Sequence, residues 1–262
     1  MICGMRNSIL AAALTLGAAP SSAVGQSAVT PVRVNNIVLV HGAFAYGSGW
    51  RGVYDQLVAR GYRVTIVQNP LTSLKDDVAA TERMLARQTG PAILVGHSYG
   101  GTVITEAGTD PKVAGLVYVA ALAPDVGEST GDQFATIPAP STFVIETGAD
   151  GYGFVNLAKF KISFAGDTSD ADAAFLGDSQ VPINMAIFGE KVTRAAWRSK
   201  PSWAVVATED GAIDPRLLRQ MAKRIGANTT EVRGSHVVFL TQPKAVADVI
   251  DQAAQGALGM RR

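Results

Sequence analysis

The chain has 262 residues, of which 47% are hydrophobic and 17% are charged, and this mix excludes an intrinsically disordered protein. Its formal net charge is +1 and it has no run of five basic residues, so nucleic acid is not an expected partner. The length allows one large α/β domain with a sizeable core.

The first 25 residues have the pattern of a secretory signal peptide. Arg6 supplies the positive charge, Ile9–Ala19 is an uncharged apolar run, and Pro20 and small residues follow. The run is shorter than the roughly 20 residues that span a bilayer, so no membrane span is expected. We expect cleavage after Ala23 or Gly25 and Sec-type export to the periplasm or beyond, with a buried N-terminal helix as the alternative.

Cysteine usage narrows the chemistry further. Cys3 is the only cysteine, and it lies within the predicted signal segment. If the signal segment is removed, the mature chain has no cysteine, which excludes disulfides, thiolate metal sites and a cysteine nucleophile.

Strand and helix patterns alternate over residues 36–123. Short apolar runs predict buried strands, and helical apolar spacing or capping residues predict helices. The expected strands are Asn36–His41, Tyr62–Val67, Ala92–Gly96 and Val113–Ala123, and the expected helices are Trp50–Arg60, Ser73–Gln88 and Thr102–Thr109. This alternation predicts a mostly parallel, doubly wound sheet with helices on both faces.

The alternation stops between about residues 125 and 200. Gly, Asp, Ser and Pro are frequent there and aromatic residues are scattered, which we interpret as an inserted, mainly helical cap. Strand and helix patterns then resume in Ser202–Thr208, Asp214–Ile225, Thr229–Val232 and Pro243–Ala254.

The strongest functional signal is the segment Gly96-His97-Ser98-Tyr99-Gly100-Gly101. It follows a predicted strand and opens a predicted helix, which is the context of a nucleophile elbow. The residues two before and two after the serine must be small in so tight a turn, and both are glycine. We therefore expect Ser98 to be a nucleophile, the alternative being a structural turn.

A serine nucleophile needs a base, and the chain has three histidines. His97 adjoins the serine and should point away, and His41 ends a strand where it suits structural support. Elimination leaves His236, in the loop after the strand Thr229–Val232.

The base in turn needs a carboxylate. Asp210 follows the strand Ser202–Thr208 directly, which gives the chain order Ser, Asp, His expected for an elbow of this kind. Three alternatives stay open: Asp214, which is also a natural helix N-cap before a proline, Glu209, and Asp125.

Two backbone N–H groups should bind the oxyanion. Tyr99 supplies one, at the start of the helix after the serine. Ala43 supplies the other, in the loop His41-Gly42-Ala43-Phe44 after the first strand; the alternative is an ordinary βα turn.

Together these motifs resemble the α/β-hydrolase superfamily, and most closely its small-esterase branch of plant methyl esterases and hydroxynitrile lyases. The motifs are His41-Gly42-Ala43-Phe44, Gly96-His97-Ser98-Tyr99-Gly100-Gly101, Thr208-Glu209-Asp210 and Gly234-Ser235-His236. The resemblance implies carboxylic ester hydrolysis without a cofactor or a metal. Lyase members carry threonine at the position of Gly42 and lysine at that of Val237, so cyanohydrin cleavage is not expected.

The expected reaction is cleavage of a small-molecule ester through an acyl-enzyme on Ser98. Phe44, Met185, Phe188 and Trp197 are expected to line an apolar substrate pocket beneath the cap. The same triad also serves perhydrolases, amidases, lactonases and C–C hydrolases, and a ligand-binding protein of this fold without turnover is the rival from another class.

Overall fold

The computed structural model describes residues 33–259 together with Met1, Ile2 and Gly4. Contacts divide the chain into Met1–Pro31 and Val32–Arg262, and all the described helices and strands belong to the second unit. The predicted signal peptide, residues 1–25, falls almost entirely outside the described residues.

Six parallel strands form the main sheet in the order β2-β1-β3-β4-β8-β9. The strands are β1 Asn36–Val40, β2 Arg63–Val67, β3 Ala92–His97, β4 Val113–Val119, β8 Ser202–Ala207 and β9 Asn228–Val232. Every residue of β1, β3, β4 and β8 is buried, because helices cover both faces of the sheet. This explains why these strands are continuous apolar runs rather than alternating ones.

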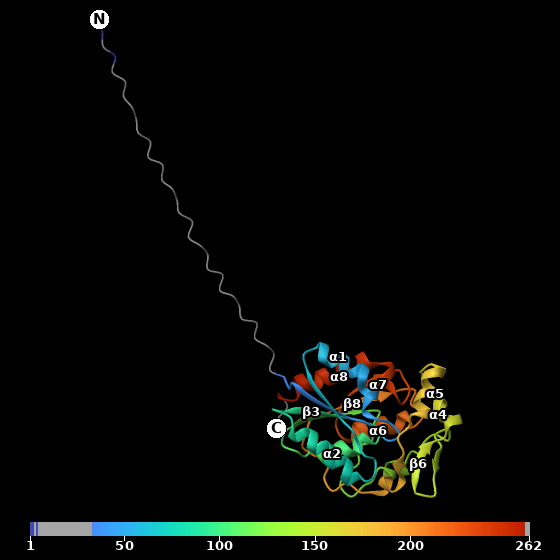
Figure 1. Cartoon of the computed structure of the whole chain (residues 1–262). Coiled ribbons are helices and arrows are strands. Elements are labelled where there is room, and N and C mark those ends of the chain that lie inside the picture. The colour runs from blue at the N-terminus through green and yellow to red at the C-terminus, as the bar shows by residue number, and fades with distance from the viewer. Residues whose placement is uncertain (3, 5–32, 260–262) are drawn as a thin grey trace. The chain divides into compact units, whose positions relative to one another are not determined.

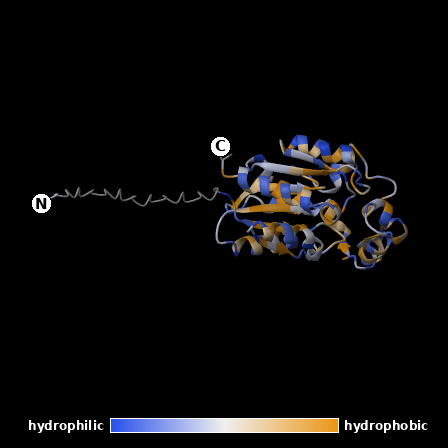
Figure 2. Cartoon of the chain, turned by 90° about the horizontal axis from the view of Figure 1, so that it is seen from above, coloured by the Kyte–Doolittle hydropathy of each residue, from blue (hydrophilic) through white to orange (hydrophobic). Residues whose placement is uncertain are grey.

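The helices form two layers around this sheet (Figure 1). Helix α1 (Arg51–Ala59) packs on α8 (Pro243–Gly256) and on the short α7 (Val238–Thr241), and α8 covers β3, β4 and β8. On the other face lie α2 (Leu74–Ala86), α3 (Gly100–Ala107) and α6 (Pro215–Arg224). In Figure 2 the helices carry both hydrophilic and hydrophobic segments, as elements that bury one face should. The predicted α/β architecture is therefore confirmed.

Two helices begin at the N-cap residues that the sequence predicted. Ser73 Oγ accepts a hydrogen bond from the Asp76 N–H at 3.0 Å and begins α2, and Asp214 accepts one from the Arg216 N–H at 2.8 Å and begins α6. The strand expected over Val113–Ala123 ends earlier, at Val119. Ala120 there has a left-handed φ of 44°, which a strand does not accommodate.

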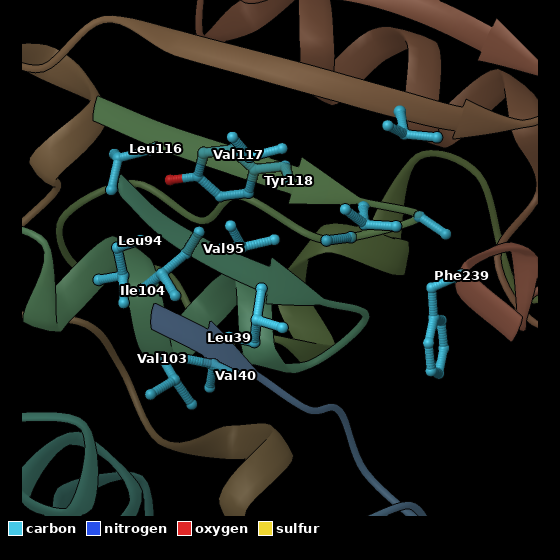
Figure 3. Close-up of a cluster of buried hydrophobic side chains, with 14 of the residues drawn as sticks. Leu39, Val40, Leu94, Val95, Val103, Ile104, Leu116, Val117, Tyr118 and Phe239 are labelled. Atoms are coloured by element: carbon cyan, nitrogen blue, oxygen red, sulfur yellow. The ribbon is translucent and has the colours of Figure 1, made fainter. Parts of the chain in front are cut away.

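The core lies at the centre of the sheet. Side chains of β1, β3 and β4 meet those of α3 there, and Leu39, Leu94, Ile104 and Val117 are fully buried (Figure 3). None of the helices in the described part of the chain is long and apolar enough to span a membrane.

The cap is the segment between β4 and β8, and α4, α5 and β6 lie together on one side of the sheet (Figure 1). It contains α4 (Leu157–Phe164), α5 (Asp170–Asp178), several 3₁₀ helices, and a small antiparallel sheet in the order β5-β6-β7. Its strands are β5 Ile145–Thr147, β6 Tyr152–Val155 and β7 Ile183–Asn184. The sequence did not predict this sheet, because strands of two to four residues are too short to show an alternating pattern.

Candidate active site

Ser98 lies at the tip of a sharp turn between β3 and α3. Its φ is 53°, a left-handed conformation that non-glycine residues adopt only where the surroundings impose it. A Cβ at Gly96 would lie 2.5 Å from the carbonyl oxygen of Gly100, and one at Gly100 would lie 2.8 Å from that of His41. The two glycines are therefore required by close backbone packing, as the motif predicted.

Three side chains from three separate loops form one hydrogen-bonded line. The Nε2 atom of His236 is 2.9 Å from Ser98 Oγ, and its Nδ1 atom is 2.8 Å from Asp210 Oδ2. His236 is 1% exposed and Asp210 is 5% exposed, so water competes little for the contact between them. All three residues follow the carboxyl ends of parallel strands, where ligand sites of open α/β sheets gather.

The second oxygen of Asp210 is held by the backbone. Its Oδ1 accepts hydrogen bonds from the N–H groups of Ala212 and Ile213, both at 2.8 Å. These bonds orient the carboxylate so that Oδ2 points at His236.

The three alternative acids have other partners. Asp214 caps α6, Glu209 pairs with Arg233 at 2.8 Å, and Asp125 pairs with Arg198 at 2.7 Å. Of the four carboxylates considered, the structure brings only Asp210 to His236.

The other two histidines have supporting roles. His97 Nε2 lies 2.9 Å from the backbone oxygen of His236, and the two rings have centroids 4.7 Å apart. Burial lowers the pKa of His97 well below its ordinary value, so the ring is neutral and donates its Nε2 proton to that carbonyl. This contact of His97 with the backbone of His236 is one that the sequence did not reveal.

His41 holds the loop that follows β1. Its Nδ1 lies 2.8 Å from the carbonyl of Gly42, and its Nε2 accepts a hydrogen bond from the Asn69 N–H at 2.9 Å. Burial lowers the pKa of His41 to about 4, so the ring is neutral near pH 7. It supports the loop that carries Ala43, as the sequence suggested.

Ala43 and Tyr99 are brought to the same cavity as Ser98. Among the described residues, neither backbone N–H donates to another backbone carbonyl outside regular helices and strands. Tyr99 precedes α3, whose dipole adds positive potential at that N–H. Binding of a negatively charged oxygen by these two N–H groups stays a prediction.

A buried carboxylate lies beneath the elbow. Asp77 of α2 accepts a hydrogen bond from the Tyr99 hydroxyl at 2.8 Å and one from the Leu71 N–H, also at 2.8 Å. Burial raises the pKa of Asp77 to about 6, against the opposing effect of these two bonds. Burial, together with the charge of Asp77, also raises the pKa of Tyr99 well above its ordinary value.

A cavity of about 270 Å³ opens at Ser98 and His236. Its wall is mainly aromatic and aliphatic, and it includes Phe44 and Phe188, as predicted, together with residues that the sequence did not single out. Those residues include Phe134, Phe143, Ile145 and Phe164 of the cap. Asp, Glu, Lys and Arg are absent from its lining residues.

Met185 and Trp197 were expected in this wall, and this expectation is wrong. Neither lines the cavity. The guanidinium groups of Arg198 and Arg224 lie 5.7 and 5.9 Å from the centre of the Trp197 ring, whose Nε1 donates to the carbonyl of Pro124 at 3.0 Å. The Met185 side chain lies against Gly153 of the small cap sheet. The cap has several apolar surfaces that an aromatic or methionine side chain can cover. The residue type alone therefore did not show which of these surfaces Met185 and Trp197 would contact.

The part of the chain that the structure describes contains no group of three or more His, Cys, Asp or Glu side chains that could hold a metal ion.

Comparison with known proteins identifies the family of the chain. The sequence profile described as "Alpha/beta hydrolase family" matches residues 37–249, which is most of the chain. The chain belongs to the alpha/beta hydrolase family. The prediction of an α/β hydrolase is confirmed at this level.

Relatives of this α/β hydrolase include enzymes named as hydrolases and esterases. It is 26% identical to the pyrethroid hydrolase of Sphingobium wenxiniae, over 87% of this chain and 91% of that protein. It is 34% identical to a carbendazim hydrolyzing esterase of a Nocardioides species, over 36% of this chain and 45% of that protein. The structure of polyneuridine aldehyde esterase shares its fold, with a TM-score of 0.72 at 16% identity over 84% of this chain and 99% of the other. This likeness shows that the two proteins have the same fold.

Proposed function

We propose that this α/β hydrolase cleaves small, uncharged carboxylic esters through an acyl-enzyme on Ser98. The observation that carries the proposal is the line Ser98–His236–Asp210, with contacts of 2.9 and 2.8 Å, at the wall of an apolar cavity. The names of the pyrethroid hydrolase and the carbendazim hydrolyzing esterase also favour hydrolysis of this class.

Acylation begins when Ser98 Oγ attacks the ester carbonyl carbon and His236 Nε2 takes the hydroxyl proton. The carbonyl oxygen becomes negatively charged and accepts hydrogen bonds from the N–H groups of Ala43 and Tyr99. The carbon–oxygen bond to the alcohol then breaks, and His236 returns its proton to the leaving oxygen. Water repeats these steps on the acyl-enzyme and releases the acid.

Asp210 acts on the base rather than on the ester. Because its carboxylate accepts the Nδ1–H of His236, Nε2 is left free to take the serine proton. Its negative charge also stabilises the imidazolium that forms during each step, in a place that is nearly closed to water.

The decisive experiment compares the wild-type protein with Ser98→Ala. We expect a fluorophosphonate probe to label the wild type but not the variant, and turnover of p-nitrophenyl acetate to fall by roughly 10⁴-fold. Ser199→Ala, a change at a serine away from the cavity lining, is the control and should behave as wild type. Near-normal turnover by Ser98→Ala would reject the mechanism, and labelling of the wild type without turnover would favour a ligand-binding protein.

We also propose that the chain is exported after removal of its first 23 or 25 residues. The charge at Arg6, the apolar run Ile9–Ala19 and the small residues after it support this. Expression of the full chain in a bacterium, followed by intact-mass measurement of the periplasmic protein, tests it. We expect a mass that begins at Val24 or Gln26, and retention of the whole chain in the cytoplasm would contradict the proposal.

A further inference from the structure

A second cavity, of about 190 Å³, lies beside the first, and the two share only Phe44 and Phe164 in their walls. It is formed between α5 of the cap and the segment that begins just after His236. Leu176 belongs to the first of these, and Val237, Phe239 and Leu240 belong to the second. The two cavities thus lie on opposite sides of a pair of aromatic rings.

The second cavity lies on the side of the base. Val237, which lines this cavity, follows His236 directly in the chain. Phe239 lines it as well, and its ring packs against the ring of His97 with centroids 4.5 Å apart. The His97 ring in turn packs against the ring of His236. Phe164, which lines both cavities, lies edge-on to the His236 ring at a centroid distance of 4.7 Å. Ser98 and His236 themselves line only the first cavity, and the second cavity is bordered by the residue that follows the base.

The chemistry of acylation assigns the two halves of an ester to different sides of Ser98. The leaving oxygen must come within hydrogen-bonding distance of His236 Nε2, because that atom returns the proton to it. The group attached to this oxygen therefore extends past the base, whereas the acyl group stays with the serine.

The side chains that line both cavities are two aromatic rings. Phe44 and Phe164 meet edge to face with centroids 6.5 Å apart, and both are 4% exposed. Phe44 has a left-handed φ of 61°, a backbone conformation that few phenylalanines adopt, in the loop that also carries Ala43. An alcohol group that enters the second cavity displaces one of these rings rather than a backbone segment.

The lining defines the kind of group that fits. Asp, Glu, Lys and Arg are absent from its lining residues, and most of the wall is aromatic or aliphatic. A dry apolar cavity of about 150 Å³ is enough to bind benzene, so one of this volume has room for a benzyl group.

We propose that the second cavity is the leaving-group subsite, which holds the uncharged alkyl or benzyl portion of the ester's alcohol, with Phe44 and Phe164 as its movable wall toward Ser98. The proposal rests on the proposed ester hydrolysis and adds to it the side on which each half of the substrate binds.

The test uses two pairs of esters. Methyl acetate and benzyl acetate differ only in the alcohol and give the same acetyl-enzyme, whereas methyl acetate and methyl phenylacetate differ only in the acyl group. Leu176→Trp fills the second cavity from α5 and touches neither Ser98 nor His236. We expect it to lower the ratio of kcat/KM for benzyl acetate over methyl acetate by about tenfold, and to change the ratio for the acyl pair less than about twofold.

Two further variants separate filling of the cavity from damage to the cap. Ile162→Trp adds similar bulk on α4, where the side chain is 64% exposed and lines neither cavity, and should leave both ratios unchanged. Leu176→Ala enlarges the cavity and should maintain or raise the benzyl ratio. Thermal unfolding of each variant shows whether it is folded.

The possible results distinguish the two proposals. If the wild type hydrolyses esters but Leu176→Trp changes both ratios equally, or only the acyl ratio, the leaving-group subsite is rejected while ester hydrolysis stands. The subsite is also rejected if Ile162→Trp lowers the benzyl ratio as much as Leu176→Trp does. It is likewise rejected if Leu176→Ala lowers the benzyl ratio. If the wild type hydrolyses none of the three esters and Ser98 is not labelled, ester hydrolysis fails and the subsite fails with it.

Discussion

At the scale of single residues, the choice of the acid shows how a few backbone bonds assign a role. Glu209, Asp210 and Asp214 lie within six positions of one another after β8, yet only Asp210 meets His236. The turn that follows it aims two N–H groups back at one of its oxygens, which leaves the other oxygen for the imidazole.

We predict that Asp210→Asn and Asp214→Asn have different effects. Asp210→Asn keeps the shape but removes the charge that stabilises the imidazolium, so turnover of p-nitrophenyl acetate should fall by roughly 10⁴-fold. Asp214→Asn should retain turnover and lose at most about 1 kcal/mol of stability, because asparagine is also a good N-cap. Steady-state kinetics and urea unfolding of both variants check this. Inactivation by Asp214→Asn with an active Asp210→Asn would move the acid to position 214.

At the scale of elements, the nucleophile elbow depends on more than its own strand and helix. Asp77 of α2 binds the hydroxyl of Tyr99 and the N–H of Leu71, and so joins the loop after β2 to the first residue beyond Ser98. Phe188, from a 3₁₀ helix of the cap, lies edge-on to the same tyrosine ring at 6.1 Å. The backbone N–H of Tyr99 is thereby fixed from two sides.

We predict a pH dependence of stability that comes from Asp77. Its pKa is about 6 in the folded chain against an ordinary 3.8, so the folded state binds the proton more tightly than the unfolded state. Stability from this group is therefore highest below about pH 4, falls as the pH rises to about 6, and stays low above that. Relative to the wild type, Asp77→Asn should gain up to about 3 kcal/mol of stability between these pH values.

Urea unfolding of both proteins across this pH range measures the difference. Asp76→Asn is the matched control, because hydrogen bonds from Ser73 and Thr72 lower the pKa of that exposed neighbour. The stability that Asp76 contributes is lost as the pH falls below about 4, whereas the stability that Asp77 contributes is lost as the pH rises. A constant difference between wild type and Asp77→Asn from pH 4 to 7 would show that Asp77 does not titrate there.

At the scale of the whole molecule, the cap is fastened to the loops of the site. Asp167, between α4 and α5, accepts hydrogen bonds from the hydroxyls of Ser235 and Thr241, the latter at 2.6 Å, on either side of His236. The N–H of Asn184 donates to the carbonyl of Leu71 at 3.0 Å on the other flank of the cap. Hydrogen bonds therefore connect the cap to the segment that carries His236.

We predict that Asp167→Ala loosens the base without removing any group that touches the substrate. Turnover should fall by about tenfold through misplacement of His236, with a loss of about 1 kcal/mol of stability for the missing hydrogen bonds. Asp167→Asn keeps an acceptor and should restore part of the rate. Asp170→Ala, which removes an exposed partner of Lys161 in the same region of the cap, should leave kinetics and unfolding unchanged. Wild-type kinetics in Asp167→Ala would show that the tether does not position the base.

The sequence by itself determined the features that depend on a few adjacent residues. The small residues around Ser98 follow from the steric limits of one turn, and the caps at Ser73 and Asp214 follow from unpaired N–H groups at helix starts. The buried strands followed from their apolar runs, and their alternation with helices followed from the requirement that both faces of a parallel sheet be covered. With only three histidines, elimination also singled out His236, whose Nε2 atom the structure places 2.9 Å from Ser98 Oγ.

Only the tertiary structure decided which distant groups meet. Ser98 and His236 are 138 positions apart in the sequence. Asp210 and the three alternative carboxylates have similar chemistry, and only the path of the loop brings Asp210 to His236. The cavity walls, the small sheet of the cap and the tether at Asp167 depend likewise on contacts between segments that no local pattern connects. The physical reason is that a capping or turn rule acts over a few bonds, whereas packing selects among many apolar and charged side chains that are locally equivalent.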